Sequence, residues 1–375
     1  MFRLTISAAA ASVLLVACGG GSDGGVDASV RASDSASVTV AAAPPAATPA
    51  PAPTPAAAPA PTPAPAARTL TNSADTLDAA MICSDNFGPN AGKAILLLPG
   101  ATQTVESEYS WSYIPALDKV GIPWCAVTLP NNNTGELQNS SEYVTHAIRK
   151  MHSITNTKIA IVGFSQSGTL PRWSLKFFPE TRAMVEDMIS IAASNQGLLE
   201  TRLLCTLPIG CPTSFSQIAT GSKWIAALNK PVETFAGIDY TQIYTKTDDI
   251  AVPAFTEELS VSSLFTGEGR RANIATQDIC PANTADHFIA GSYDPVVYAL
   301  VLDAFRNSGP ASVARVKPAS PIAGVCSQLA SPGIDLISLP VNFASKMMFN
   351  FAFSVAFQTK VTKEPELKCY VNGSC

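Results

Sequence analysis

Short apolar runs that alternate with helix-like segments place the strongest constraint on the fold of this chain. Residues 94–98, 124–128 and 158–162 are apolar runs suited to buried strands, and a turn follows the first of them at Pro99-Gly100. Residues 141–151, between the second and third runs, repeat apolar side chains at the spacing of one helix face. Strands and helices in alternation pack as a mainly parallel sheet covered on both faces, so the sequence predicts an α/β fold.

The same alternation continues through the second half of the chain. Residues 188–192, 241–245 and 272–276 are further strand candidates. Asp294-Pro295 suits the cap and first turn of a helix that runs to about Asn307. These segments extend the predicted sheet and its helical cover.

An alanine, proline and threonine tract limits how much of the chain can fold. Residues 41–67 contain only these three types, with 10 of the 29 prolines. A segment without charges, aromatics or branched aliphatics cannot bury enough surface to offset its ordering entropy, so it predicts an extended, semi-rigid spacer. We therefore expect a leader at residues 1–17, a disordered tether at 18–68 and one folded domain at 69–375.

The leader has the features of an export signal. Arg3 precedes an apolar stretch from Leu4 to Ala17 that is too short to span a bilayer. Leu15-Val-Ala-Cys18 resembles the lipobox of bacterial lipoproteins, in which the cysteine carries lipid; an ordinary signal peptide with an incidental cysteine is the alternative. Gly19 follows, rather than the aspartate that retains lipoproteins at the inner membrane. We expect an exported protein that is anchored through Cys18 at the bacterial outer membrane or cell surface, or is released from it.

Charge and cysteine usage exclude several classes of protein. The net charge is −5, and the 24 Lys and Arg residues form no basic cluster, which argues against a nucleic-acid partner. There is no CxxC pair and there are three histidines, so we expect no structural zinc and no cofactor. An even number of cysteines beyond Cys18 predicts disulfides in an exported protein, in any of 105 pairings. These cysteines are Cys83, Cys125, Cys205, Cys211, Cys280, Cys326, Cys369 and Cys375.

The candidate chemistry lies in the segment from Gly163 to Gly168, which reads Gly-Phe-Ser-Gln-Ser-Gly. It follows the apolar run 158–162 directly and leads into a predicted helix at 169–178. A serine on such a strand-to-helix turn is the nucleophile elbow of α/β-hydrolases, in which small neighbours allow a strained turn that exposes the hydroxyl. Ser167 stands where the usual G-x-S-x-G pattern has its second glycine. The alternative is a small-residue turn that only packs a helix against the sheet.

A serine nucleophile needs a base and an acid, which in this fold follow it in the order acid, then histidine. His287 is the one histidine after Ser165, and we place it on a loop before the helix that opens at Asp294. The acid should follow a strand, and the strand candidate 241–245 leads directly into Asp248 and Asp249. The other aspartates considered are Asp187, Asp239, Asp278 and Asp286, the last of which we expect to be solvated.

From about residue 75 to 316 the chain resembles the Candida antarctica lipase B-like family and its bacterial relatives. The resemblance implies an α/β-hydrolase fold and a serine esterase or lipase that hydrolyses carboxylic esters. The matching stretches occur in the order of the family with similar separations. They are Leu96 to Gly100, Trp111 to Pro115, Gly121 to Cys125, Trp173 to Pro179, Thr245 to Ile250, and Ala285 to His287.

The family's functional residues carry over to matching positions of this chain. The resemblance implies Ser165 as nucleophile, Asp248 rather than Asp249 as acid, and His287 as base. It also implies an oxyanion hole made by the backbone N–H groups of Ala101 and Gln166. The disulfides that it implies are Cys83 to Cys125 and Cys280 to Cys326, and proximity in the sequence then suggests Cys205 to Cys211 and Cys369 to Cys375.

Three positions depart from the family. Ala101 replaces a threonine whose hydroxyl is an additional oxyanion donor, so that donor is missing unless Thr102 supplies it. Phe164 replaces a tryptophan, which should enlarge the pocket for the alcohol part of the ester. Ser167 replaces the second glycine of the elbow.

The expected class of substrate is inferred from an apolar segment near the C-terminus and from the residues expected to line the substrate pocket. Residues 343–357 hold many Phe and Met side chains and resemble the family's helix beside the acyl pocket; a core helix or strand is the alternative. With Ile250, Thr102 and Phe164 as pocket residues, we expect a monomer that acts on medium to long acyl esters, including triacylglycerols. An extracellular polyester depolymerase and a non-catalytic surface lipoprotein remain alternatives.

Overall fold

The computed structural model describes residues 67–373, which all belong to the larger of two compact units of the chain, residues 62–375. The proposed leader at 1–17, Cys18, nearly all of the tether and Cys375 lie outside the described residues.

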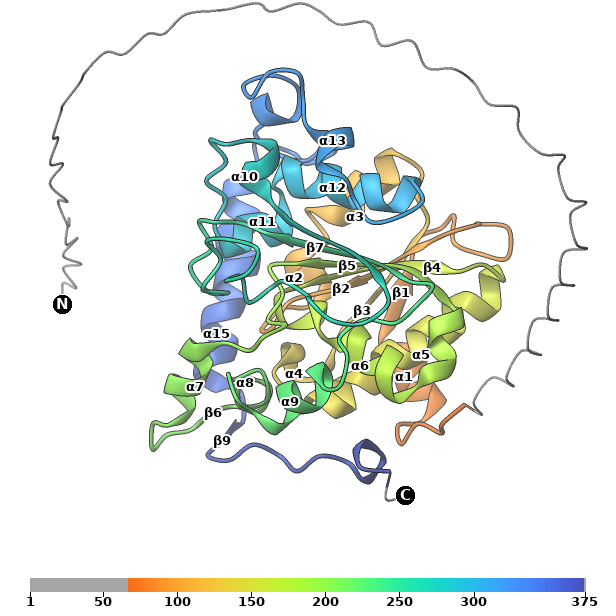
Figure 1. The fold of residues 1–375 in the computed structure, drawn as a ribbon, viewed down its shortest axis with the longest axis vertical. Coiled ribbons are helices and arrows are strands. Elements are labelled where there is room, and N and C mark those ends of the chain that lie inside the picture. Colours follow the sequence, from red (N-terminus) through yellow and green to blue (C-terminus); the bar gives the residue numbers. More distant parts are fainter. Residues whose placement is uncertain (1–66, 374–375) are drawn as a thin grey trace, which may run out of the picture. The chain divides into compact units, whose positions relative to one another are not determined.

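The described chain is built around a sheet of seven strands (Figure 1). Its order is β1-β3-β2-β4-β5-β7-β8, and every neighbouring pair is parallel except β1 with β3. This confirms the predicted α/β fold. The strands are β1 (Met81–Cys83), β2 (Ile95–Leu98), β3 (Trp124–Val127), β4 (Ile159–Phe164), β5 (Val185–Ile191), β7 (Asp239–Tyr244) and β8 (Arg270–Ala275).

Helices cover both faces of this sheet (Figure 1). Ile95 and Leu97 of β2 pack in a core with α3 (Tyr113–Lys119) and α12 (Pro295–Arg306). Leu96 and Leu98 point to the other face and pack with α5 (Leu137–Thr155) and α6 (Leu170–Phe177). Because successive side chains of a strand point to opposite faces, a strand buried on both sides is apolar throughout, as the sequence runs are.

The remaining helices lie before the first strand, in the connections between strands and after the sheet. Helix α12 begins after the predicted cap, where the Asp294 carboxylate accepts hydrogen bonds from the N–H groups of Val296 and Val297. The others are α1 (Ala74–Ala79), α2 (Val105–Glu108), α4 (Pro130–Asn133), α7 (Leu199–Cys205), α8 (Thr213–Gln217), α9 (Lys223–Asn229), α10 (Thr276–Ile279), α11 (His287–Ser292), α13 (Val313–Val316) and α14 (Leu339–Asn342). The 3-10 turns are η1 (Ser165–Gly168), η2 (Pro179–Ala183), η3 (Gly324–Ser327) and η5 (Cys369–Val371).

The apolar C-terminal segment is helical. It consists of a π-helix, η4 (Phe343–Met348), that continues into α15 (Phe349–Phe357). The alternative of a core segment is wrong for most of its length, because Phe349 and Phe357 are 65% and 75% exposed and Phe353 is also exposed. Met347 alone among its large apolar side chains is fully buried.

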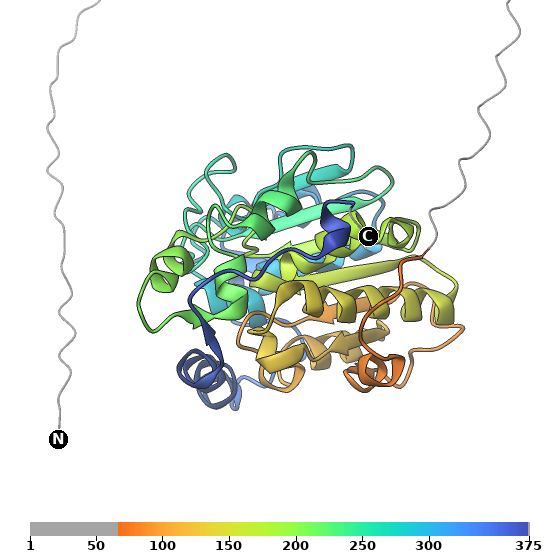
Figure 2. The ribbon, with the colours of Figure 1, turned by 90° about the horizontal axis from the view of Figure 1, so that it is seen from below.

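After α15 the chain forms β9 (Lys360–Val361), which pairs with β6 (Cys211–Pro212) in a second, two-stranded sheet. It then crosses the molecule to α6 (Figure 2), where the Tyr370 hydroxyl accepts a hydrogen bond of 3.0 Å from the indole N–H of Trp173. This path ties the end of the chain to the helix that follows the serine turn.

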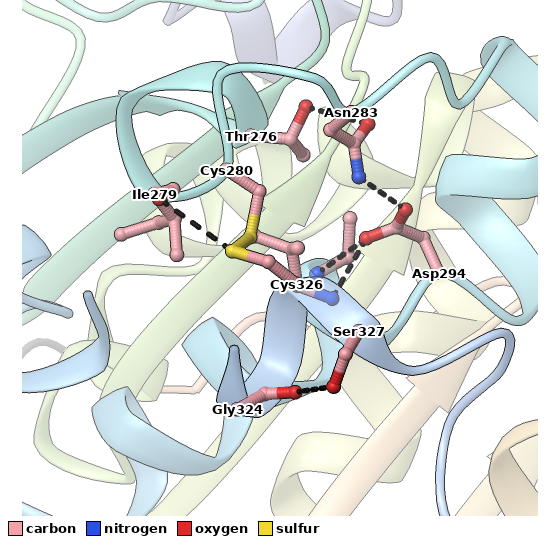
Figure 3. The surroundings of a disulfide bond; sticks show 10 residues. Thr276, Ile279, Cys280, Asn283, Asp294, Gly324, Cys326 and Ser327 are labelled. Atoms are coloured by element: carbon pink, nitrogen blue, oxygen red, sulfur yellow. Dashed lines mark hydrogen bonds between the residues drawn. A yellow bond between two sulfur atoms is a disulfide. The ribbon is translucent and has the colours of Figure 1, made fainter. Parts of the chain in front are cut away.

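Three disulfide bonds join pairs of cysteines among the described residues. Cys83 is bonded to Cys125, Cys205 to Cys211, and Cys280 to Cys326. Cys369 is also disulfide-bonded, and its expected partner Cys375 lies outside the described residues. The third bond joins the segment after β8 to η3 (Figure 3).

Helices α11 and α12 together form one stretch, His287–Arg306, that is long and apolar enough to cross a membrane. Of this window 72% is buried inside the fold, as in the core helix of a folded domain. Its apolar character is therefore explained by packing against the sheet.

Candidate active site

The serine of the predicted elbow lies at the carboxyl end of the central strand β4. Ser165 has a φ of +53°, a left-handed conformation that is uncommon for a residue with a side chain. A Cβ atom at Gly163 would lie 2.3 Å from the Ser167 carbonyl oxygen, so only glycine fits there. At Gly168 a Cβ atom would lie 2.6 Å from the Cβ of Ala193, a residue that follows the neighbouring strand β5. Gly168, one place later than in the usual motif, thus provides the close approach of turn and sheet.

Ser165, His287 and Asp248 form a continuous chain of hydrogen bonds. The Ser165 Oγ lies 2.9 Å from the His287 Nε2, and the His287 Nδ1 lies 3.0 Å from each Asp248 carboxylate oxygen. All three side chains are buried. An imidazole in this position can take the proton of the hydroxyl while a carboxylate balances the charge that develops on the ring.

The loop after β7 presents Asp248 and not Asp249 to the imidazole. The Asp248 Oδ1 also accepts hydrogen bonds from the N–H groups of Ile250, at 2.9 Å, and Ala251, at 2.6 Å. Burial raises the pKa of Asp248, but the charge of His287 and these hydrogen bonds outweigh burial, so the pKa lies below its ordinary value. The carboxyl group is therefore ionised at neutral pH. Asp249 instead accepts from the backbone N–H of His287, at 3.4 Å.

The base is positioned by a helix rather than by the expected loop. His287 is the first residue of α11, and the Asp286 carboxylate caps this helix by accepting from the N–H of Ile289 at 2.8 Å. Asp286 is thus half-buried and engaged in capping, not solvated as the sequence suggested. The Phe164 ring packs beside the imidazole with the ring centroids 4.8 Å apart.

The two residues expected to supply the oxyanion donors are both near Ser165. Gln166 is the second residue of η1, and the first N–H groups of a helix have no partner within it. Ala101 lies in the turn after β2 and lines the same pocket as Ser165 and His287. Two backbone N–H groups beside a serine hydroxyl are the arrangement that stabilises a negatively charged oxygen in acyl transfer.

Thr102 does not replace the missing hydroxyl donor. Its side chain is fully buried, donates a hydrogen bond to the Ala101 carbonyl oxygen and accepts one of 3.2 Å from the Gln103 Nε2. It is also absent from the lining of the pocket beside Ser165, where the sequence analysis placed it. The expectation for Thr102 as a pocket residue is therefore wrong, because its hydroxyl is buried and bonded to Ala101 and Gln103.

An apolar pocket of about 250 Å³ opens beside Ser165 and His287. Phe164 and Ile250 line it, as expected from the sequence. Helix α7 forms one wall, and Phe351 of α15 contributes to another. The other lining residues are Ala101, Leu198, Glu200, Thr201, Leu204, Phe215, Ile218, Asp249 and Phe288.

Asn133 supports the elbow and was not singled out in the sequence. Its buried amide donates to the Ser167 Oγ at 2.8 Å and to the Pro99 carbonyl oxygen at 3.0 Å. The Gln166 Nε2 in turn donates to the Asn133 carbonyl oxygen and Oδ1, at 2.7 and 2.9 Å. Ser167 therefore has a defined role that a glycine could not have. The signal in the sequence was the Asn131-Asn132-Asn133 triplet, a residue type that tolerates the left-handed conformation that all three adopt.

No group of three or more His, Cys, Asp or Glu residues within residues 67–373 is arranged to hold a metal ion.

The sheet order, the elbow after β4 and the positions of Asp248 and His287 define an α/β-hydrolase fold, and comparisons with known proteins agree. No family model matches the chain. Over 219 residues it is 29% identical to lipase B of Pseudozyma antarctica, formerly Candida antarctica, a match that covers 58% of this chain and 62% of that protein. The match thus spans less than two thirds of the relative's length. The crystal structure of Aspergillus fumigatus lipase B is similar with a TM-score of 0.72 at 24% identity, over 82% of this chain and 74% of that chain. The structural likeness shows the fold.

Proposed function

We propose that the protein is a serine hydrolase of carboxylic esters, with Ser165 as nucleophile, His287 as general base and Asp248 as the acid that orients it. The observation that carries the proposal is the hydrogen-bonded chain from the Ser165 Oγ to Asp248, at 2.9 and 3.0 Å, at the edge of an apolar pocket. The similarity to lipase B of Pseudozyma antarctica supports the same reaction class.

The proposed reaction is acyl transfer through a covalent intermediate. The Ser165 Oγ attacks the ester carbonyl carbon while the His287 Nε2 takes the hydroxyl proton. The N–H groups of Ala101 and Gln166 stabilise the oxyanion, and His287 returns the proton to the leaving alcohol as the carbon–oxygen bond breaks. Water, deprotonated by the same imidazole, then attacks the acyl-enzyme, releases the carboxylic acid and restores Ser165.

The pocket supports esters with apolar acyl chains. Its walls are mainly aliphatic and aromatic and include residues of α7 and α15, and these two helices also expose Leu199, Leu203, Phe349 and Phe353 to solvent. An acyl chain gains free energy by leaving water for such a pocket. We therefore propose medium to long acyl esters, including triacylglycerols, as substrates. The test compares p-nitrophenyl esters of increasing acyl length with an emulsified triglyceride and a polyester film.

The assignment of the nucleophile is tested by Ser165→Ala. This change should lower ester hydrolysis by more than about 10⁴-fold with no loss of folded protein, because it removes the hydroxyl that is bonded to the His287 Nε2. A fluorophosphonate should label the wild-type protein and not Ser165→Ala.

The matched control is Ser167→Ala, which removes the other hydroxyl of the elbow and should still be labelled. Labelling of Ser165→Ala, or folded wild-type protein that neither reacts nor hydrolyses esters, would contradict the proposal. The second result would favour the non-catalytic surface lipoprotein.

We further propose that the enzyme is exported and held at a bacterial membrane through lipid on Cys18. The three described disulfides support export, since such bonds persist in oxidising compartments. Cys18→Ala expressed in a bacterial host should shift the protein from the membrane fraction to the soluble exported fraction. An unchanged membrane fraction would contradict lipid attachment at this residue.

A further inference from the structure

The C-terminal helical segment is bound to the turn that carries the Ala101 N–H. From this geometry we propose that Asn350 and Ser354 of α15 are positioning residues for the oxyanion site. The inference rests on the function proposed above. Neither side chain reaches the ester; both act through the carbonyl group of Thr102.

The turn needs such support because its conformation is strained. It is closed by a hydrogen bond of 3.2 Å from the Gln103 N–H to the Gly100 carbonyl oxygen. Thr102, its third residue, has a φ of +69°, a value that such turns normally assign to glycine and that a β-branched residue rarely adopts. A strained residue persists only where its surroundings hold it. Because Ala101 directly precedes Thr102, the contacts that hold Thr102 also position the Ala101 N–H.

Three hydrogen bonds between the C-terminal segment and this turn hold the turn in place. The Asn350 Nδ2 donates to the Thr102 carbonyl oxygen at 2.6 Å, and the fully buried Ser354 Oγ donates to the same oxygen at 3.3 Å. The two side chains share a helix face because they are four residues apart. The Gln103 Nε2 donates to the Met347 carbonyl oxygen at 3.2 Å, at the junction of η4 and α15. The Thr102 carbonyl group and the Gln103 side chain, on the two sides of the same peptide bond, are therefore both held by the C-terminal segment.

The same network reaches the second oxyanion donor. The Asn132 Nδ2 donates to the Asn350 Oδ1 at 3.4 Å and to the Ser354 Oγ at 3.2 Å. The next residue, Asn133, receives the side-chain hydrogen bonds of Gln166. One set of polar contacts therefore extends from the Ala101 turn through α15 and the asparagine triplet to Gln166. We infer that it fixes the spacing of the two N–H groups that bind the oxyanion.

The helix is well placed to couple the pocket to this turn. Phe351, the residue after Asn350, lines the apolar pocket, while Phe349 and Phe353 face solvent. Binding of an acyl chain against Phe351 would restrain the helix whose other face holds Thr102. The segment begins with a π-helix, a rare conformation that often marks functional positions.

The test replaces Asn350 by aspartate, which keeps the shape of the side chain and removes its donor to Thr102. Wild-type and variant proteins are titrated with a fluorophosphonate so that rates refer to active sites. For a soluble p-nitrophenyl ester we expect kcat to fall tenfold or more and KM to stay within twofold. The affinity of an alkyl boronic acid, which forms a tetrahedral adduct with an active serine, should fall by a similar factor.

Asn342→Asp is the matched control, because Asn342 is a half-buried asparagine at the end of α14, directly before this segment, and its amide donates to the Ser338 Oγ at 3.2 Å rather than to the oxyanion turn. It should keep wild-type kcat and boronic acid affinity. A merely structural role for Asn350 would lower the yield or melting temperature and leave kcat per titrated site unchanged, which would overturn the proposal.

Should Asn350→Asp fail to fold, Ser354→Ala provides the second test. It removes the longer of the two hydrogen bonds and should lower kcat two- to fivefold without a change in KM. An unchanged kcat in this variant would also overturn the proposal. Active wild-type enzyme with insensitive variants refutes only the positioning role, whereas inactive, unlabelled wild-type protein refutes the proposed function itself.

Discussion

At the scale of single residues, the least expected group beside the site is a buried carboxyl. Glu108 is fully buried at the end of α2, and one of its oxygens accepts a hydrogen bond of 2.8 Å from the Gly100 N–H. The other oxygen is also buried, and the carboxyl group lies beside the Tyr109 side chain. Burial raises the pKa of Glu108 to about 8, in opposition to the hydrogen bond from Gly100. The side chain is therefore largely protonated at neutral pH and supports the first residue of the oxyanion turn as an uncharged group.

This raised pKa predicts a definite dependence of stability on pH. Between the ordinary value of 4.5 and about 8, the folded protein keeps a proton on Glu108 that the unfolded chain releases. The free energy of unfolding therefore decreases as the pH rises through this window, by at most about 1.4 kcal/mol per pH unit from this group. Glu108→Gln, which cannot ionise, should lack this contribution.

The measurement is urea unfolding of both proteins at several pH values from 5 to 9. The stability of Glu108→Gln relative to the wild type should rise with pH and level off above about 8. Glu106→Gln, in the same helix but exposed, serves as the control and should show a constant difference from the wild type. If the free energies of unfolding of Glu108→Gln and the wild type changed with pH in the same way, the assignment of a buried proton to Glu108 would be contradicted.

At the scale of elements, helix α11 determines where the imidazole lies. His287 is its first residue, and the Asp286 cap fixes the direction in which the helix begins. Loss of an N-cap side chain costs about 1 kcal/mol, whereas asparagine caps as well as aspartate. We expect Asp286→Ala to lower the free energy of unfolding by about this amount and to lower kcat severalfold, because the base is less well positioned.

Asp286→Asn is the informative comparison, since it keeps the cap and removes the charge. Urea unfolding and ester hydrolysis should both remain near wild type in this variant. Equal losses in the alanine and asparagine variants would mean that the charge of Asp286, rather than its hydrogen bond to Ile289, is what matters.

The elements that the sequence could predict are those with a local signal. The six predicted strands of the large sheet are present with shifted ends; the run at 158–162, for example, continues to Phe164 at the elbow. Strand β1 was missed because it is three residues long and is defined only by its antiparallel pairing with β3. His287 was expected on a loop, but it begins helix α11. The prediction missed this helix because it is short and the helix signal at Asp294, a few residues later, is stronger.

The same distinction holds for residues of the site. Ser165, His287 and Asp248 carry signals in the motif, in chain order and in the resemblance, and the structure brings them together. Asn350 carries no such signal, and the asparagine triplet at Asn133 indicates only a left-handed backbone, because the importance of both side chains arises from contacts 248 and 34 residues away in the sequence. Supporting polar residues of this kind become visible only when the fold is known.

At the scale of the whole molecule, exposed apolar side chains gather on the two elements beside the pocket. Helix α7 exposes Leu199 and Leu203, and α15 exposes Phe349, Phe353 and Phe357. The three phenylalanines follow one another at four-residue spacing and their rings pack in sequence, with centroids 6.2 and 4.9 Å apart. A row of exposed, contacting aromatic rings such as that on α15 marks a site of contact with another apolar surface.

Because residues of both helices line the pocket, we expect the apolar side chains that they expose to contact the lipid phase that contains the substrate. Phe353→Ser combined with Phe357→Ser removes two of its rings without touching the residues that line the pocket. Hydrolysis of a dissolved short-chain p-nitrophenyl ester should stay within twofold of wild type. Hydrolysis of an emulsified triglyceride should fall tenfold or more, because each buried aromatic side chain contributes about 1.5–3 kcal/mol to adsorption.

Adsorption to triglyceride droplets, measured by depletion of protein from the water phase, identifies the cause of the loss. It should weaken in the double variant in parallel with the rate on the emulsion. The control is Ile322→Ser combined with Leu329→Ser, which removes two side chains that are 80% and 78% exposed and do not line the pocket beside Ser165. If the control loses emulsion activity to the same extent, or if the phenylalanine variant loses activity equally on both substrates, α15 has no particular role at the lipid surface. A selective loss would mean that one helix presents its outer face to lipid, lines the acyl pocket through Phe351 and holds the oxyanion turn through Asn350.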